Sequence, residues 1–326
     1  MKWISGTRAW VTIVAAGALT LSACSSEGGA DEAEQAATGA QGMTFAMVTH
    51  AAPGDTFWDI IRKGADAAAE KNGVELEYSN SIDASKQATL IQNAIDREVD
   101  GLAVTIPNPG ALNPVIQKAA DAGIPVVAFN AGFDDWQDSG ALMYFGQDEI
   151  LAGREAGKRL RHEGAKKVLC VLQEQGQVQL ESRCDGVKQG FGGTTEKLYV
   201  EGEDMTSVQS TIQAKLTEDP TITHVVTLAA PIALVASQSI SAADSSAKLV
   251  TFDTNAQLVT ALQDGRVEWA IDQQPYLQGY HAIDNLALYK TNRNILGGGQ
   301  AVLTGPSFID KSNVDAIAEY AKRGTR

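Results

Sequence analysis

The feature that most constrains this fold is a regular alternation of short apolar runs with helical stretches. The first series pairs "MTFAMVTH" (43–50), "VELEYS" (74–79) and "GLAVTI" (101–106) with helical patterns at 56–72, 84–98 and 111–122, and closes on "IPVVAF" (124–129). The apolar runs are continuous rather than alternating, as in parallel strands that helices cover on both faces. We therefore predict an α/β fold.

The pattern then begins again. Apolar runs "ALMYFG", "KKVLCVL", "KLYVEG", "THVVTL", "KLVTFD" and "VEWAID" precede helical stretches near 148–163, 182–192, 206–218, 231–242, 255–264 and 276–290, and extended "AVLTGPSFID" precedes helical "SNVDAIAEYAKR". Two series of similar size predict two similar Rossmann-like domains, each a doubly wound parallel sheet. We expect residues 43–146 plus 274–305 in one lobe and 147–273 plus 306–326 in the other. Crossings near 146, 273 and 305 would form a three-segment hinge of the kind that closes on ligands.

The amino-terminal stretch "MKWISGTRAWVTIVAAGALTLSAC" is typical of an export signal. Lys2 and Arg8 precede an apolar run too short to span a bilayer. Leu21 to Cys24 resembles the lipobox of bacterial lipoproteins, so we expect a signal peptide at 1–23 and lipidation of Cys24. A simple signal peptide cut nearby, with Cys24 incidental, is the alternative. The small and acidic residues of 24–42 predict a flexible tether, and the protein would be anchored to the outer face of the membrane or be periplasmic.

Several functional classes fit poorly. The formal net charge of −14 argues against nucleic-acid binding, which needs a basic face. The chain has no GxGxxG, Walker, HExxH or GxSxG motif, and its 4 histidines lack metal-ligand spacing, so we expect no cofactor and no metal. Only His50 would lie near a cleft, and a hydrolase or isomerase is the remaining enzyme hypothesis.

Polar and aromatic side chains recur where the expected strands end, the edge at which open α/β sheets bind ligands. The candidates are Asp55, Phe57, Trp58, Thr105, Asn108, Asn130, Arg183, Asp253 and Gln273. Amide, carboxylate and guanidinium groups can hydrogen-bond vicinal hydroxyls, and an aromatic face can cover the C–H side of a sugar-like ring. This set predicts a site for a small neutral polyhydroxylated molecule.

Each candidate also has a purely structural interpretation. The aromatic pair could belong to the core, although adjacent helical residues point about 100° apart. Asn130 and Asp253 could cap turns or helices, Arg183 could form a surface ion pair, and Gln273 could be exposed. Their recurrence at strand ends favours a binding site.

From Met43 to the carboxyl terminus the chain resembles periplasmic-binding-protein-type solute receptors of the ribose/galactose class, which serve ABC importers. The resemblance rests on "DTFWDIIRKGADAAAEKNG", "QNAIDREVDGLAVTIPNPGALNPVIQKAADAGIPVVAFNAG", "RCDGVKQGF", "LVTFDTN" and "IDQQP". It implies that the aromatic pair stacks on the ligand and that Arg183, in an R-x-x-G motif completed by Gly186, binds hydroxyls. Asp253, Gln273 and Thr105 match further ligand positions of the family.

Two positions depart from that pattern. Asn130-Ala131 stands where many sugar receptors carry Asp-Arg, and Ala229-Ala230 stands where an asparagine or aspartate often follows the eighth strand. Fewer charged anchors suggest a longer, less acidic ligand such as a sugar alcohol, a cyclitol or a different sugar. Trp136 either supplies a further wall of the site or packs within its loop.

The resulting hypothesis is a monomeric, lipid-anchored receptor that captures a sugar or polyol between its lobes and delivers it to an ABC permease. The alternative is a ligand-sensing lipoprotein that acts on a membrane signalling partner. A sugar repressor would need a DNA-binding helix-turn-helix where this chain has a signal and an acidic tether.

Cys170 and Cys184 complete the sequence features. Cys170 lies in an expected strand, and Cys184 in the expected first turn of the helix that carries Arg183. Export implies an oxidising compartment, so we predict a disulfide. Such a bridge would contribute about 3 kcal/mol and fix the helix start that aims Arg183. Two buried free thiols are the alternative.

Overall fold

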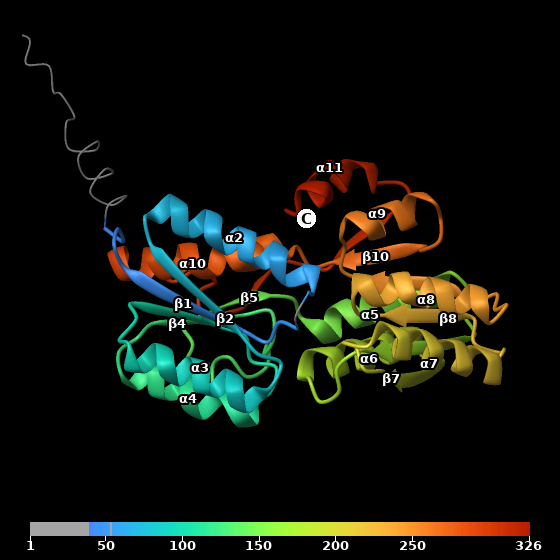
Figure 1. Cartoon of the computed structure of the whole chain (residues 1–326), viewed down its shortest axis with the longest axis horizontal. Helices are drawn as coiled ribbons and strands as arrows, with labels where there is room; N and C mark the ends of the chain where they lie inside the picture. Colours follow the sequence, from blue (N-terminus) through green and yellow to red (C-terminus); the bar gives the residue numbers. More distant parts are fainter. Residues whose placement is uncertain (1–38, 53) are drawn as a thin grey trace, which may run out of the picture.

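The computed structural model describes residues 39–52 and 54–326, which form two lobes, each a six-stranded sheet between helices (Figure 1). The first sheet has the order β11-β5-β4-β3-β1-β2, and all its strands are parallel. It consists of β1 (Thr44–Thr49), β2 (Glu75–Asn80), β3 (Gly101–Val104), β4 (Val126–Phe129), β5 (Met143–Gly146) and β11 (Val302–Leu303), with helices α2 (Thr56–Asn72), α3 (Ala84–Asp96), α4 (Pro109–Asp121) and α10 (Pro275–Asn292).

The second sheet repeats this arrangement in the order β12-β10-β9-β8-β6-β7, and only β12 is antiparallel. Its strands are β6 (Lys167–Leu172), β7 (Thr194–Tyr199), β8 (His224–Thr227), β9 (Lys248–Phe252), β10 (Trp269–Asp272) and β12 (Ser307–Asp310). The helices are α5 (Glu149–His162), α6 (Val178–Phe191), α7 (Met205–Glu218), α8 (Ala230–Ala242), α9 (Ala256–Gln263) and α11 (Asp315–Arg323). The α/β fold class with two similar lobes is thus confirmed.

The continuous apolar runs of the sequence correspond to strands buried on both faces. Every residue of β3, β4, β5, β8 and β10 is buried. Each lobe has two hydrophobic clusters. The core of each lobe is therefore complete without the other, and the lobes can meet through polar surfaces.

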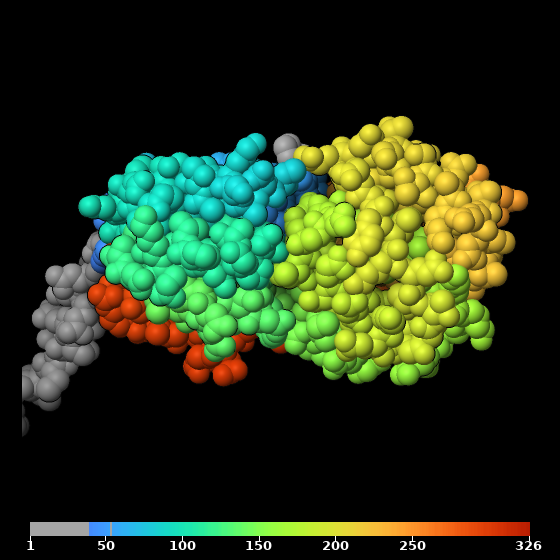
Figure 2. Space-filling view, turned by 90° about the horizontal axis from the view of Figure 1, so that it is seen from below, coloured from blue at the N-terminus to red at the C-terminus, as the bar shows by residue number. Residues whose placement is uncertain are grey.

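The chain passes between the sheets three times, after β5, β10 and β11. These crossings are bonded to one another: Thr304 N donates to Gly146 O (2.7 Å) and Gln274 Nε2 donates to Thr304 O (2.6 Å). Away from the crossings the lobes also touch along the face seen in Figure 2. Val178 N, at the start of α6, also donates to Pro107 O of the first lobe at 3.2 Å.

Two elements of the second lobe begin three or four residues earlier than predicted. Helix α6 begins at Val178 rather than near residue 182, because its first turn follows Gln177, which makes no side-chain cap bond, and so shows no start signal. Strand β7 begins at Thr194 rather than at Lys197, because it is an edge strand whose residues are all half-buried or exposed, so that its apolar pattern is weak.

The amino-terminal expectations fall mostly outside the described residues. The signal peptide, Cys24 and the tether up to residue 38 belong to that part. Ala40 is buried in the first lobe and Gly42 N donates to Gly73 O (2.9 Å), so the packed body includes the last residues that we assigned to the tether. Among the described helices, none combines the length and apolarity that a membrane span requires.

Candidate functional site

A cavity lies between the lobes, where the carboxyl ends of the strands face each other. We call it the ligand cavity. Its lining includes seven of the nine principal site residues predicted from sequence: Asp55, Phe57, Trp58, Asn130, Arg183, Asp253 and Gln273. The remaining lining residues are His50, Gln173, Glu174, Gln177, Gln179, Leu180, Leu228 and Ala229.

Asn130 and Asp253 occupy equivalent positions in the two lobes. Each follows a central strand, β4 or β9, and each adopts a left-handed conformation, with φ of 64° and 66°. Asparagine and aspartate tolerate this conformation better than most residues. Neither residue caps a helix: Asn255 caps α9 by accepting from Leu258 N (2.8 Å). Their shared backbone geometry and their place in the cavity lining support a role in binding rather than in capping.

A chain of amide hydrogen bonds connects these two positions through the second crossing. Asn130 Nδ2 donates to Gln273 Oε1 (3.3 Å), and Gln273 Nε2 donates to Asp253 Oδ1 (2.8 Å). Burial raises the pKa of Asp253 to about 7, although Arg183 and the bond from Gln273 act in the opposite direction. Bonded donors from a ligand would favour the ionised carboxylate.

Arg183 is buried, with 2% of its surface exposed, and is not a surface ion pair. Its Nε and Nη2 donate to the two carboxylate oxygens of Glu149 (2.7 and 2.9 Å), and Nη1 donates to Leu228 O (3.1 Å). The guanidinium also lies 4.8 Å from the ring centroid of Phe252. A guanidinium has five N–H donors, so two remain for a ligand. The sequence analysis missed Glu149, since an acidic residue in a first helical turn is common without any such role.

Close packing of α5 and α6 brings Arg183 to Glu149. A Cβ at Gly186 would lie 2.5 Å from Ile150 O, and one at Gly153 would lie 2.1 Å from Arg183 O, so only glycine permits this approach. The glycine of the R-x-x-G motif therefore acts through helix packing. This contact fixes the depth at which the guanidinium enters the cavity.

The disulfide between Cys170 and Cys184 is confirmed, with Cα atoms 6.0 Å apart. It ties β6 to α6 directly after Arg183. Because α6 begins at Val178, Cys184 lies in its second turn, whereas the sequence predicts the first turn. The bridge thus holds the turn that carries Arg183 rather than the start of the helix.

Phe57 and Trp58 form one aromatic wall of the cavity at the start of α2. Their rings meet edge to face, with centroids 5.4 Å apart, and Trp58 packs in the same way on His50 at 4.6 Å. Asp55 caps α2 by accepting from Phe57 N (3.0 Å). Both aromatic residues are largely buried and belong to the core of the first lobe. They are therefore core residues and cavity-lining residues at the same time.

Three other residues do not line the ligand cavity. Thr105 hydrogen-bonds His50 Nδ1 through its hydroxyl (2.8 Å) and so supports a lining residue from behind. Asn108 is exposed and caps α4 by accepting from Ala111 N (3.2 Å). Trp136 is buried in a hydrophobic cluster of the first lobe, which corresponds to the loop-packing interpretation.

Several of the residues that the sequence analysis missed are close together in the chain. The loop between β6 and α6 contributes Gln173, Glu174 and Gln177, and the first turn of α6 contributes Gln179. The amide-rich sequence "QEQGQVQ" was the available signal. Burial raises the pKa of Glu174 to about 7, with further contributions from Asp55 and Glu203, while burial lowers the pKa of His50 to about 3. His50 is therefore neutral.

These groups can bind hydroxyls in both directions but hold no excess positive charge. Glu149 balances Arg183, and Asp55, Glu174 and Asp253 are acidic. Anionic ligands are therefore disfavoured. The described residues contain no group of acidic, histidine or cysteine side chains suited to a metal ion. The arrangement suits a compact, neutral molecule with several hydroxyls.

Comparisons with known proteins agree with this geometry. A solved carbohydrate transporter from Acidothermus cellulolyticus, in complex with myo-inositol, is 61% identical, with a TM-score of 0.86 over 87% of this chain and 99% of that one. The xylose/arabinose-binding protein of Sulfolobus acidocaldarius is 24% identical, and the match covers 72% of this chain and 63% of that protein. A xylitol-binding protein of Mycolicibacterium smegmatis is 29% identical over 49% of this chain and 44% of its own length. Residues 45–294 match the model of the periplasmic binding protein domain, and the chain belongs to that family of solute-binding proteins.

Proposed function

We propose that this protein captures a sugar or polyol in the ligand cavity and delivers it to an ABC importer, and that a cyclitol such as myo-inositol is its best ligand. The observation that carries the proposal is the convergence of Arg183, Asp253, Asn130 and Trp58 on one neutral-to-acidic cavity. The 61% identity to a transporter protein bound to myo-inositol supports the cyclitol. The carbohydrate-transporter description of that relative favours import over a sensory role.

The chemistry of the cavity matches a cyclitol in two respects. Every hydroxyl both donates and accepts, and the cavity offers two free N–H groups of Arg183 beside Asp253. Among the described residues, only one oxygen of Asp253 accepts a side-chain hydrogen bond, so the other is available to a ligand hydroxyl. The ring of Trp58 can cover the C–H face.

Binding in this proposal involves no covalent chemistry and no cofactor. Residues 43–146 plus 274–305 would move against 147–273 plus 306–326 about the three crossings, and the ligand would favour the closed arrangement by contacting both lobes. The protein would act as a monomer held by a lipid at Cys24 on the outer face of the membrane.

Isothermal titration calorimetry with myo-inositol, xylitol, D-xylose, D-arabinose, amino acids and inorganic phosphate tests the proposal. We expect binding of polyols or sugars only, and binding confined to amino acids or phosphate would refute it. Asp253→Asn should lower the affinity at least 30-fold, because it removes an ionised acceptor worth about 2 kcal/mol. Asn108→Ala is the matched control, since Asn108 caps α4 outside the cavity.

A further inference from the structure

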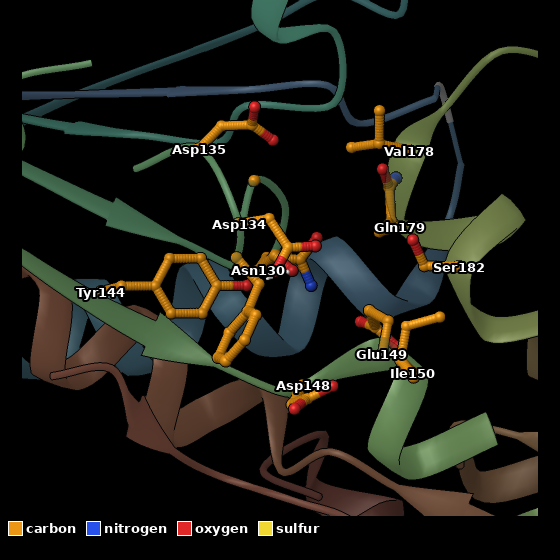
Figure 3. A pocket seen from close by; sticks show the side chains of 12 residues that line it. Asn130, Asp134, Asp135, Tyr144, Asp148, Glu149, Ile150, Val178, Gln179 and Ser182 are labelled. Carbon is orange, nitrogen blue, oxygen red and sulfur yellow. Dashed lines mark hydrogen bonds between the residues drawn. The ribbon is translucent and has the colours of Figure 1, made fainter. Parts of the chain in front are cut away.

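A second cavity adjoins the ligand cavity, and we call it the acidic cavity. The two cavities share two lining residues, Asn130 from the first lobe and Gln179 from the second. Figure 3 shows Gln179 on α6, across the acidic cavity from Asp134 and Asp135. The side chain of Gln179 therefore stands where the two cavities meet.

Gln179 is held in this position from the opposite lobe. Only 6% of its surface is exposed, and its Nε2 donates to His50 Nε2 (3.1 Å). Neutral His50 then carries its proton on Nδ1 and donates it to Thr105 Oγ1 (2.8 Å). The backbone bond from Val178 N to Pro107 O (3.2 Å) fixes the adjacent residue of α6 to the same lobe. These bonds and the burial hold the side chain of Gln179 between the two cavities.

The acidic cavity has a distinct chemistry. Asp134, Asp135 and Asp148 line it without any lysine or arginine in the lining. Burial and the neighbouring Asp134 and Asp138 raise the pKa of Asp135. Among the residues that the structure describes, nothing hydrogen-bonds the buried Oε1 of Gln179. The surroundings therefore supply acceptors for hydroxyl groups and repel anions.

We propose that Gln179, positioned by His50, determines specificity by limiting the ligand to a single ring, and that shortening it opens the ligand cavity into the acidic cavity. The joined cavities would admit a polyol that carries a second, hydroxylated sugar ring. A phosphorylated polyol would gain nothing, because its charge would meet the aspartates. This inference rests on the proposed function.

Calorimetry with myo-inositol, its galactoside galactinol and myo-inositol 1-phosphate tests the inference on the wild type and Gln179→Ala. We expect the Kd ratio of galactinol to myo-inositol to fall at least 10-fold in the variant, with no gain for the phosphate. His50→Phe keeps an aromatic edge on Trp58 but cannot hold Gln179, and it should shift the ratio in the same direction by a smaller factor. Ser182→Ala, which alters the acidic cavity only, should leave the ratio unchanged.

The outcomes separate the two proposals. If the wild type binds no polyol or sugar, the proposed function fails. If it binds myo-inositol and Gln179→Ala changes the affinities for myo-inositol and galactinol by equal factors, Gln179 does not limit ligand size and this inference fails. Gln179→Ser serves as a second truncation, and thermal unfolding checks the folding of each variant. If the ligand is a pentose, xylose and xylobiose replace the cyclitol pair in the same comparison.

Discussion

Removal of Glu149 tests how the ligand cavity holds the charged guanidinium of Arg183. The Arg183 and Glu149 side chains are 3% and 4% exposed and share two hydrogen bonds of 2.7 and 2.9 Å. Burial alone would lower the pKa of Arg183, but Glu149 reverses this effect, so the pKa is raised and the guanidinium stays charged. Glu149→Ala therefore leaves a buried cation without its counter-charge.

The expected cost follows from that burial. Removal of one partner of a buried ion pair lowers the free energy of unfolding by about 3–5 kcal/mol, whereas replacement of both partners by apolar residues changes it far less. We expect Glu149→Ala to cost about 3–5 kcal/mol and the double variant Arg183→Met/Glu149→Leu to stay within about 2 kcal/mol of the wild type. The contact of Arg183 with Phe252 leaves apolar surroundings into which a methionine can pack.

Urea unfolding, followed by circular dichroism at pH 7.5 without ligand, measures these differences. The double-mutant cycle isolates the coupling between the two residues. A coupling of at least 2 kcal/mol is expected from a desolvated pair. Additive effects of the single substitutions, with a double variant as unstable as their sum, would refute the reasoning, because they would show that the two charges are independently solvated.

Three further predictions concern the same cavity. Burial raises the pKa of Asp253 to about 7, so the stability of the ligand-free protein should fall as pH rises from about 4 to 7. Affinity for a hydroxylated ligand should instead increase until about pH 8, because the carboxylate becomes ionised. Equal pH profiles for wild type and Asp253→Asn in urea unfolding would contradict this. Reduction of the Cys170–Cys184 bridge should cost about 3 kcal/mol in urea unfolding with and without a phosphine reductant, and an unchanged midpoint would exclude a stabilising role. Trp58→Ala should weaken ligand binding in calorimetry, because Trp58 lines the ligand cavity. Trp136→Ala should lower the free energy of unfolding by about 3–5 kcal/mol and leave the affinity of the folded protein unchanged, because Trp136 packs in the core. The reverse pattern would show that Trp136 lines the site and Trp58 only packs in the core.

The sequence by itself determined the architecture and most of the cavity. Continuous apolar strands can be buried only between two helical layers, so the α/β class follows from local pattern. Parallel strands carry their carboxyl ends to one edge, which is why Asn130, Asp253 and Arg183 could be placed in a common cavity before any coordinates were known. The cysteine pair was recognisable because exported proteins favour disulfides.

The tertiary structure alone decided which strand-end residues line the cavity between the lobes. Thr105 lies at the expected edge, yet its hydroxyl bonds His50 behind the cavity wall. The pairing of Arg183 with Glu149 depends on the close packing of α5 and α6, and the bond between His50 and Gln179 depends on how the lobes are set against each other. Residues far apart in the chain meet in these contacts, and no local periodicity encodes the angle between two separately folded cores.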